Sequence, residues 1–167
     1  MSSENEILIT NATIDDLDEL HGIESASFSP GRAAGYEAFS YRLKAYPQWF
    51  FKAVADGKII GLLNGASSDR RYITDDLYIE GGAFDEHGEN FLIYGIAVLP
   101  EYRRKGIAHK LISRALSIAK ERGKTRVSLT CKEELVGFYE SFGFIDHGIS
   151  ESVAGNVISH DMEIDLY

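Results

Sequence analysis

One segment of the chain constrains the fold most, because an apolar strand, a basic turn and an amphipathic helix follow one another directly. Residues 91–99 form a near-continuous apolar run, which is typical of a central strand covered on both faces. Basic residues 103–105 and Gly106 come next, and apolar residues at helical spacing follow them. The backbone N–H groups at a helix start lack partners inside the helix and bind anions readily. The segment therefore predicts a site for an anionic ligand.

Composition restricts the partners. The 167 residues carry a formal net charge of −9, so the basic turn is a local feature of an acidic chain and an extended nucleic-acid surface is not expected. With 44% apolar and 26% charged residues, the chain reads as one globular domain over residues 1–167. No apolar run approaches the roughly 20 residues of a membrane span.

Cysteine and histidine usage argues against a disulfide framework or a metal site. Cys131 is the single cysteine, and the five histidines show no metal-ligand spacing. Residues 1–6 lack the basic and apolar regions of a signal peptide. We therefore expect a cytoplasmic protein, either monomer or homodimer, with no metal and no membrane or nucleic-acid partner.

The order of the expected elements indicates an α/β domain with a mixed sheet. A helix is expected to begin after Thr13 and to break at residues 29–31, and Asp56-Gly57 is a strong hairpin signal. Residues 67–90 are polar and read as a long loop. The expected strands cover residues 6–10, 49–55, 58–66, 91–99, 126–131, 144–147 and 157–165. The further expected helices cover residues 36–45, 134–142 and the stretch from Ile107 to before Gly123.

This order and the basic turn resemble the GNAT N-acetyltransferase superfamily. Its signature is Gln or Arg, two variable residues, Gly, one variable residue, then Gly or Ala, which residues 103–108 match. The resemblance implies a mixed, mostly antiparallel sheet of about seven strands with helices on both faces, and acetyl-CoA as co-substrate. The alternative is a solvated basic turn that caps a helix. The residues that would hold acetyl-CoA are Ile96, Ala97, Val98, Arg103, Arg104, Lys105, Gly106, Ile107, Ala108, His109 and Tyr139.

A second motif is the aromatic-rich segment at residues 138–144. In the superfamily the tyrosine of this segment points at the coenzyme sulfur, which implies that Tyr139 is the general acid. A phenol, with a pKa near 10, suits protonation of a departing thiolate. We expect Phe138, Phe142 and Phe144 to be core aromatics.

Within the superfamily the chain is most similar to the arylalkylamine N-acetyltransferase type, which includes serotonin N-acetyltransferase. Residues 23–28, 129–139 and 155–164 carry this likeness. It implies direct attack by a small primary amine, arylalkylamine or polyamine-like, in a ternary complex. The implied substrate-binding residues are Phe28, Tyr94, Ile96, Thr130 and Asp161.

The chain departs from that type at the two central-strand positions where the animal enzyme has histidines that relay protons. Leu92 and Tyr94 stand there. The open alternatives for the proton acceptor are a water chain past Tyr94, His87, or a carboxylate such as Asp76. Cys131 is expected to be a small wall residue, because Lys132, the nearby group that would lower its pKa, points the other way along a strand.

Two rival functions remain. One is acetylation of a protein N-terminus or lysine, and the other is a non-catalytic acyl-CoA-binding module, suggested by the missing histidines. His160 and Asp161 are neighbours on a strand and so face opposite sides. If Asp161 faces inward, its carboxylate favours a cationic substrate.

Overall fold

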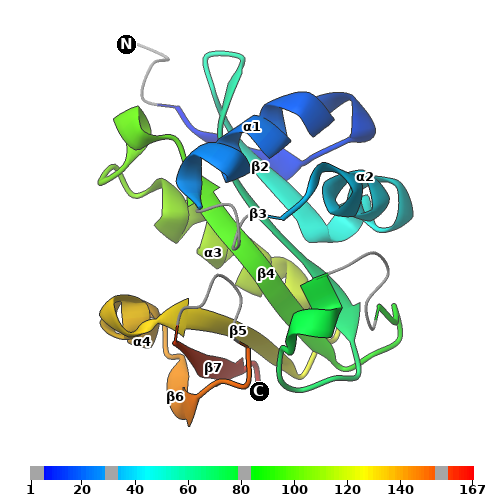
Figure 1. Ribbon diagram of the computed structural model, residues 1–167, viewed down its shortest axis with the longest axis vertical. Coiled ribbons are helices and arrows are strands. Elements are labelled where there is room, and N and C mark those ends of the chain that lie inside the picture. The colour runs from blue at the N-terminus through cyan, green and yellow to red at the C-terminus, as the bar shows by residue number, and fades with distance from the viewer. Residues whose placement is uncertain (1–5, 29–33, 79–83, 153–157) are drawn as a thin grey trace. The chain divides into compact units, whose positions relative to one another are not determined.

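The computed structural model describes residues 6–28, 34–78, 84–152 and 158–167. Seven strands form one sheet in the order β1-β2-β3-β4-β5-β7-β6 (Figure 1). The strands are β1 (Leu8–Asn11), β2 (Phe50–Ala55), β3 (Lys58–Ser68), β4 (Asn90–Val98), β5 (Arg126–Lys132), β6 (Ile145–Ile149) and β7 (Ser159–Asp165). The α-helices are α1 (Leu17–Ser27), α2 (Tyr36–Ala45), α3 (Ile107–Glu121) and α4 (Val136–Glu140). Short 3-10 turns are η2 (Ile14–Asp16), η3 (Pro47–Trp49), η4 (Asp75–Tyr78), η5 (Pro100–Tyr102) and η6 (Glu133–Leu135).

The sheet is mixed. β1 with β2, β2 with β3, β5 with β7, and β6 with β7 pair antiparallel, whereas β4 and β5 pair parallel. The β4–β5 ladder joins Asn90 to Arg126 and extends as far as Leu92 with Ser128. Together with the solved structures compared below, this arrangement confirms the predicted α/β fold.

The chain divides into two compact units. Unit 1 comprises Met1–Asn64 and Gly95–Ala115, and unit 2 comprises Gly65–Tyr94 and Leu116–Tyr167. β3, β4 and α3 each contribute residues to both units. The two units are described separately below.

Helices cover both faces of the strands in unit 1. Leu62 of β3 packs in a cluster with residues of α1 and α2, including Leu20, Ile23 and Phe39. A Cβ on the neighbouring Gly61 would instead lie 3.5 Å from Ile107 of α3. Because successive strand residues point to opposite faces, the α1–α2 pair and α3 cover different faces here.

The core of unit 2 is built on the buried stretches of β4 and β5. Phe91 and Leu92 of β4 and Val127 of β5 are fully buried. Leu92 packs against Ile73 and Leu77, from the segment before β4. The near-continuous apolar pattern of β4 thus reflects a strand that is largely buried in the sheet, as the sequence predicts.

Local signals placed several elements correctly. α2 spans residues 36–45 as predicted, and Asp56 and Gly57 both have positive φ, at 50° and 77°, as a tight hairpin of this kind requires. Thr13 is the N-cap of η2, with Asp16 completing a capping box, and α1 follows directly. The predicted break at residues 29–31 and the predicted start of the last strand at Val157 lie outside the described residues.

Other boundaries differ from the predictions. The predicted helix over residues 134–142 is only η6 and α4, because Phe142 and Phe144 donate backbone bonds to Tyr139 and the chain turns at Gly143, whose φ is 104°. The long loop is shorter than predicted, since β3 runs on to Ser68 and η4 lies within the remainder. In the described part of the chain, no helix has the length and hydropathy to cross a membrane, and no group of His, Cys, Asp and Glu could hold a metal ion.

Candidate functional site

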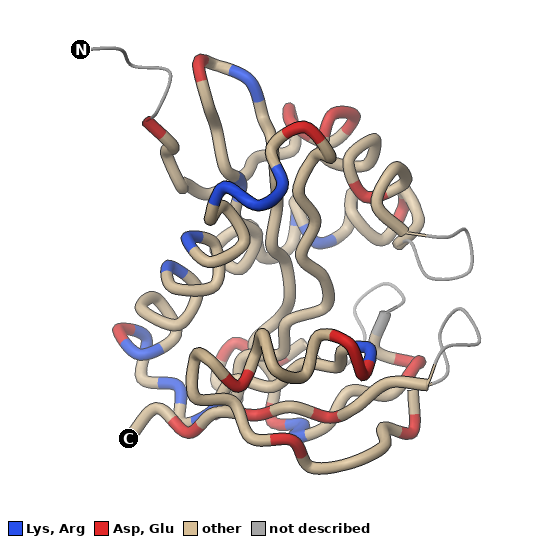
Figure 2. Tube along the Cα trace, turned by 90° about the vertical axis from the view of Figure 1, so that its left-hand side faces the viewer, with Lys and Arg blue, Asp and Glu red and all other residues tan. Residues whose placement is uncertain are grey.

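The basic turn of unit 1 exposes both charge and backbone. Arg104 and Lys105 are solvent-exposed, and this stretch lies in blue at the start of α3 in Figure 2. Arg103 has a structural contact, because its Nε donates to the carbonyl of Val98 at 2.9 Å. The Lys105 ammonium lies 5.5 Å from the centre of the Tyr102 ring. The turn is thus fixed at Arg103 and presents two cations to solvent.

The backbone of this turn fits an anion at the start of α3. Arg104 and Gly106 adopt positive φ, at 64° and 80°, and a Cβ on Gly106 would meet nothing within 4 Å. The helical bond from Lys110 N–H to the Gly106 carbonyl opens α3, so the N–H groups before Lys110 have no acceptor inside the helix. A pyrophosphate would find donors, a helix dipole and two cations at one position.

The strand that leads into the turn is accessible only at its centre. Tyr94, Gly95 and Ile96 are half-buried, while Ala97 and Val98 are buried. Tyr94 packs against the cluster that contains Leu92. Phe28, the C-cap of α1, packs against the core cluster of unit 1.

A buried polar cluster in unit 1 was not found from the sequence. Glu24 of α1 is only 4% exposed and its Oε2 accepts from the Ala34 N–H at 2.9 Å. Arg42 of α2 is also buried and donates to Asn64 Oδ1 at 2.8 Å. A Cβ on Gly95 would lie 3.8 Å from both Asn64 Nδ2 and Glu24 Oε1. The available signal was the spacing, since Glu24 follows Leu17 and Leu20 on the apolar side of α1.

Tyr139 lies on α4 in unit 2 among aromatic rings. It is 8% exposed, with ring centres of Phe138 and Phe144 at 5.2 Å and 5.8 Å in edge-to-face contact. Phe144 is buried and Phe142 half-buried, as expected of core aromatics. Phe138 is 38% exposed, so the prediction that it is a core residue is wrong. It lies on α4, which is a single short helix, and its ring contacts the Phe142 ring while remaining partly open to solvent.

Asp161 lies in a pocket of unit 2 with a volume of about 350 Å³. Its Oδ1 is buried and has no hydrogen-bond partner among the described residues. Burial raises the pKa of Asp161, with Glu151 acting in the same direction, and a hydrogen bond from Ser150 offsets this only in part. The pocket is lined by Tyr72, Ile73, Thr74, His147, Ile149, Glu151 and Asp161.

Two predicted substrate residues meet in this unit. Thr130 of β5 is the register partner of Asp161 on β7, so their side chains share one face of the sheet. His160 contacts Asp146 through Nδ1 at 3.1 Å and does not line the pocket. Cys131, the register partner of His160, is buried, which agrees with a wall residue.

Next to the pocket, a network of charges surrounds the buried Glu163. Arg71 donates two hydrogen bonds to its carboxylate, at 3.0 Å and 2.5 Å, and His147 Nε2 lies 3.0 Å from Oε1. Burial opposes ionisation of Glu163, but the Arg71 hydrogen bonds together with His147 and Arg126 outweigh it and hold the pKa of this carboxyl below its usual range. Glu163 is therefore a paired structural anion. Oδ1 of Asp161, by contrast, has no hydrogen-bond partner among the described residues.

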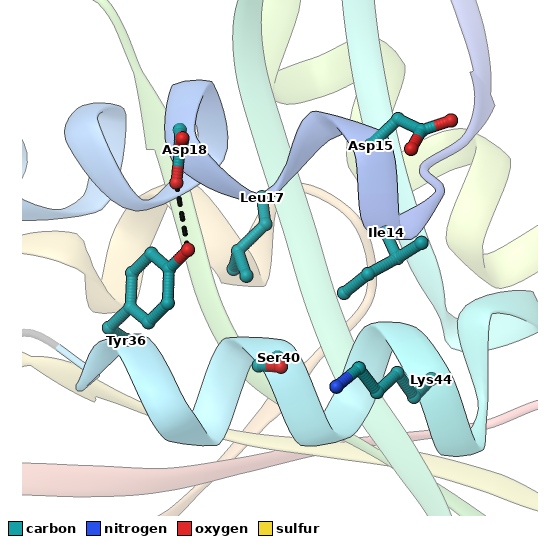
Figure 3. A pocket seen from close by; sticks show the side chains of 7 residues that line it. All are labelled: Ile14, Asp15, Leu17, Asp18, Tyr36, Ser40 and Lys44. Atoms are coloured by element: carbon teal, nitrogen blue, oxygen red, sulfur yellow. Dashed lines mark hydrogen bonds between the residues drawn. The ribbon is translucent and has the colours of Figure 1, made fainter.

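A second hollow, of about 390 Å³, lies between η2–α1 and α2 in unit 1 (Figure 3). The Tyr36 hydroxyl donates to Asp18 at 2.9 Å, and this hydrogen bond raises the pKa of Tyr36. Its lining comprises Ile14, Asp15, Leu17, Asp18, Tyr36, Ser40 and Lys44. None of these is a residue that the motifs single out.

Comparisons with known proteins agree with these features. A family model described as the acetyltransferase (GNAT) family matches residues 17–144. An uncharacterised N-acetyltransferase of Methanocaldococcus jannaschii is 29% identical over 148 residues, which cover 81% of this chain and 59% of the relative. The chain thus spans about six-tenths of the length of that curated relative.

Solved structures share the fold at low sequence identity. The loading GNATL domain of CurA from Lyngbya majuscula is 16% identical with a TM-score of 0.83, over 96% of this chain and 98% of that one. The Salmonella typhimurium protein yncA, solved with its cofactor acetyl-CoA, is 16% identical with a TM-score of 0.71, over 97% and 95%. Because the family model covers most of the residues, including the basic turn and the Tyr139 segment, the chain belongs to the GNAT acetyltransferase family.

Proposed function

We propose that the protein is an N-acetyltransferase that moves the acetyl group of acetyl-CoA to a small, cationic primary amine of the arylalkylamine or polyamine-like class. Membership of the family and the exposed basic turn support the donor. The single observation that carries the acceptor class is the buried, unpartnered Oδ1 of Asp161 in the pocket of unit 2.

On the donor side, acetyl-CoA supplies an activated acetyl thioester, and unit 1 holds it. Arg104 and Lys105 neutralise the pyrophosphate, while Gly106 lets the backbone of the turn approach it. Arg103 keeps the turn in place through the Val98 carbonyl. The N–H groups of Ile107, Ala108 and His109 donate to phosphate oxygens, and the backbone of Ile96, Ala97 and Val98 orients the thioester. In unit 2, Tyr139 protonates the departing sulfur.

On the acceptor side, Asp161 binds the ammonium group. Glu151 adds a second carboxylate to the pocket, and Tyr72 adds an aromatic wall. Burial raises the pKa of Asp161, and a bound cation would favour its charged form. Thr130, the register partner of Asp161, is a further proposed substrate contact in unit 2. Phe28, Tyr94 and Ile96 stay proposed as substrate-binding residues by the family resemblance alone.

An amine panel tests this function. Purified protein is mixed with acetyl-CoA and 2-phenylethylamine, 1,4-diaminobutane or a short peptide with a free N-terminus, and released thiol is measured. We expect turnover with the free amines and little with the peptide. Turnover confined to the peptide supports the protein acetyltransferase instead, and acetyl-CoA binding by calorimetry without thiol release from any acceptor supports a non-catalytic module.

The basic turn gives a prediction for donor binding. Arg104→Ala combined with Lys105→Ala should weaken acetyl-CoA binding about ten-fold at low salt, since exposed charge contacts contribute up to about 1 kcal/mol each. The difference should shrink as salt is raised. Arg114→Ala with Arg122→Ala removes the same charge from exposed positions and serves as the control. Equal losses in both pairs would mean that net charge alone governs binding.

Asp161→Asn tests acceptor binding. It keeps the shape of the side chain and removes its charge, so kcat/KM for 1,4-diaminobutane should fall between about ten-fold and a hundred-fold, the range for one charged hydrogen bond. Acetyl-CoA affinity should not change. Asp69→Asn, at an exposed carboxylate of the same unit, is the matched control. An unchanged kcat/KM would remove Asp161 from the acceptor site.

A further inference from the structure

We propose that His147, held by Glu163, accepts the proton that the amine must lose before it can be acetylated. This inference rests on the proposed function, because it names the proton acceptor for the amine of that reaction. It is carried by the position of His147 opposite Asp161, in the pocket where the ammonium group is proposed to bind. The three residues all belong to unit 2, so the proton transfer needs no contact between the units.

An irregularity in β6 places His147 opposite Asp161. The β6–β7 register shifts after Asp146 and resumes at Ile149, so His147 and Gly148 together stand opposite the single residue Asp161. This is the pattern of a β-bulge, a device that re-aims side chains next to functional sites. Gly148 supplies the positive φ of 96° that the bulge uses, and its N–H donates to Asp146 Oδ1 at 2.8 Å. The bulge therefore brings an imidazole into the pocket of the Asp161 carboxylate.

Glu163 and Arg71 orient the imidazole. Nε2 of His147 lies 3.0 Å from Oε1 of Glu163, and Arg71 fixes that carboxylate with two hydrogen bonds. A carboxylate at this distance favours the tautomer with its proton on Nε2, which leaves the lone pair on Nδ1. The same carboxylate stabilises the imidazolium that forms when Nδ1 accepts a proton. The His147 side chain is 31% exposed, so solvent can take the proton afterwards.

The charges around His147 favour a cation. The positive charge of His147 lowers the pKa of Asp146, after the larger effect of the Gly148 hydrogen bond, and it also opposes the rise in the pKa of Asp161. Four carboxylates therefore face two guanidinium groups in this region. The titratable and charged groups are Arg71 and Tyr72 before β4, Arg126 of β5, Asp146 of β6, Glu151 after β6, and His160, Asp161 and Glu163 of β7.

An imidazole is the better base for this substrate than a carboxylate of the same pocket. Alkylammonium groups ordinarily lose their proton near pH 10, imidazoles near 6.5 and carboxyls near 4. Transfer from an ammonium to an imidazole is thus about two to three powers of ten less unfavourable than transfer to a carboxylate. Asp161 is suited to hold the ammonium, and His147 to deprotonate it.

The acceptors considered from the sequence are less suitable. Asp76 is exposed, and a hydrogen bond from Thr74 lowers the pKa of its carboxyl, so it is a weaker base than usual. His87 is exposed in the loop before β4, where its backbone N–H donates to Asp85. Tyr94 packs against an apolar cluster. The described lining of the Asp161 pocket includes none of these three candidates.

The proton transfer balances as follows. The bound ammonium gives one proton to Nδ1 of His147, which becomes an imidazolium. The neutral amine then forms the C–N bond as the C–S bond of the thioester breaks, and the second nitrogen proton compensates the one that the sulfur receives. The imidazolium finally releases its proton to solvent, so one proton is liberated per amide formed.

His147→Gln separates this role from a structural one. The Gln amide can still donate to Glu163, while the basic nitrogen is lost. With the amine of the panel that is turned over fastest, kcat should fall about a hundred-fold or more, the range for one general base. Wild-type kcat should fall as the pH drops through about 8 to 5, where an imidazole gains its proton, and this acid limb should be absent from the variant. Acetyl-CoA affinity and the melting temperature should stay close to wild type.

His160→Asn is the matched control. It removes a histidine from the neighbouring strand and keeps a nitrogen that can contact Asp146, as Nδ1 of His160 does at 3.1 Å. His160 does not line the pocket. The control should therefore keep both the wild-type kcat and the acid limb.

Glu163→Gln tests the positioning residue. Without the anion the imidazolium loses its partner, so the acid limb should move to lower pH and kcat should fall by less than in His147→Gln. A purely structural role of Glu163 would lower the melting temperature and leave the position of the limb unchanged.

Rescue by a small molecule gives an independent readout. His147→Ala opens space at a partly exposed position, so added imidazole should raise its kcat after subtraction of the reaction without protein. His147→Gln keeps that space filled and should gain nothing. An Ala variant that gains no turnover from imidazole would contradict the proposal.

Failure of this proposal and failure of the proposed function give different results. If wild type acetylates an amine while His147→Gln keeps its kcat and its acid limb, His147 is not the proton acceptor and the proposed function stands. If wild type acetylates no amine, the proposed function fails and this proposal with it. A 15N spectrum that places the proton of neutral His147 on Nδ1 would also overturn the proposal.

Discussion

Tyr139→Phe should lower kcat about a hundred-fold or more while leaving the dissociation constant of acetyl-CoA nearly unchanged. The substitution removes one hydroxyl group and keeps the ring that packs edge-on against Phe138 and Phe144. A positioned general acid contributes roughly 10²- to 10⁴-fold, and a thiolate without a proton donor is a poorer leaving group. The loss should therefore appear in turnover measured by thiol release.

Tyr167→Phe is the matched control for this variant. Its hydroxyl donates to the Lys120 carbonyl on the exposed surface, so the same atom is removed far along the chain from α4. Thermal unfolding of both variants should be close to wild type. If Tyr139→Phe turns over as fast as wild type, Tyr139 is only a core aromatic, and the sulfur must take its proton from another group.

Elements defined by local chemistry were predicted well from the sequence. α2 has the predicted bounds, and the hairpin lies at Asp56-Gly57, because turn residues and helical spacing act within a few positions. The basic turn before α3 was also found, since it is contiguous. The prediction was less accurate for residues 134–142, where a helical pattern competes with a turn signal. There α4 is short because Gly143 and the backbone hydrogen bonds to the Tyr139 carbonyl end the helix.

Site features made by distant residues were predicted only in part. Asp161 was singled out, but whether it or His160 faces inward depends on the β5–β7 register. The Arg71–Glu163 pair joins residues 92 positions apart, and the Arg42–Asn64 pair 22 positions apart. A single sequence contains no signal for such partners. Glu24 had a weak signal, an acidic residue on an apolar helix face, which becomes meaningful only when the buried surroundings are known.

Gly65→Ala should be strongly destabilising although it leaves φ unstrained. A Cβ on Gly65 of β3 would lie 1.9 Å from the Leu92 carbonyl oxygen and 3.0 Å from the Ile93 Cα, both in the backbone of β4. Backbone in the middle of a sheet cannot move aside as a flexible side chain can. We expect a loss of more than about 3 kcal/mol of unfolding free energy, which is at the upper end for overpacking.

Two further glycines turn this expectation into a graded test. At Gly61 the nearest atom, the Ala97 carbonyl oxygen, is 3.1 Å from the added Cβ, so Gly61→Ala should cost about 1 kcal/mol. Gly22 lies exposed within α1 with nothing within 4 Å, so Gly22→Ala should stabilise by roughly 0.5–1 kcal/mol.

Urea unfolding of the three variants should therefore rank them in the order Gly22→Ala, Gly61→Ala, Gly65→Ala, with only the first above wild type. A Gly65→Ala protein as stable as Gly61→Ala would show that β3 and β4 do not approach each other this closely. The close contact at Gly65 also fixes the backbone of β4 at Leu92, whose side chain is buried in an apolar cluster. A leucine side chain cannot relay a proton, so any group that takes the proton of the amine must lie at another position.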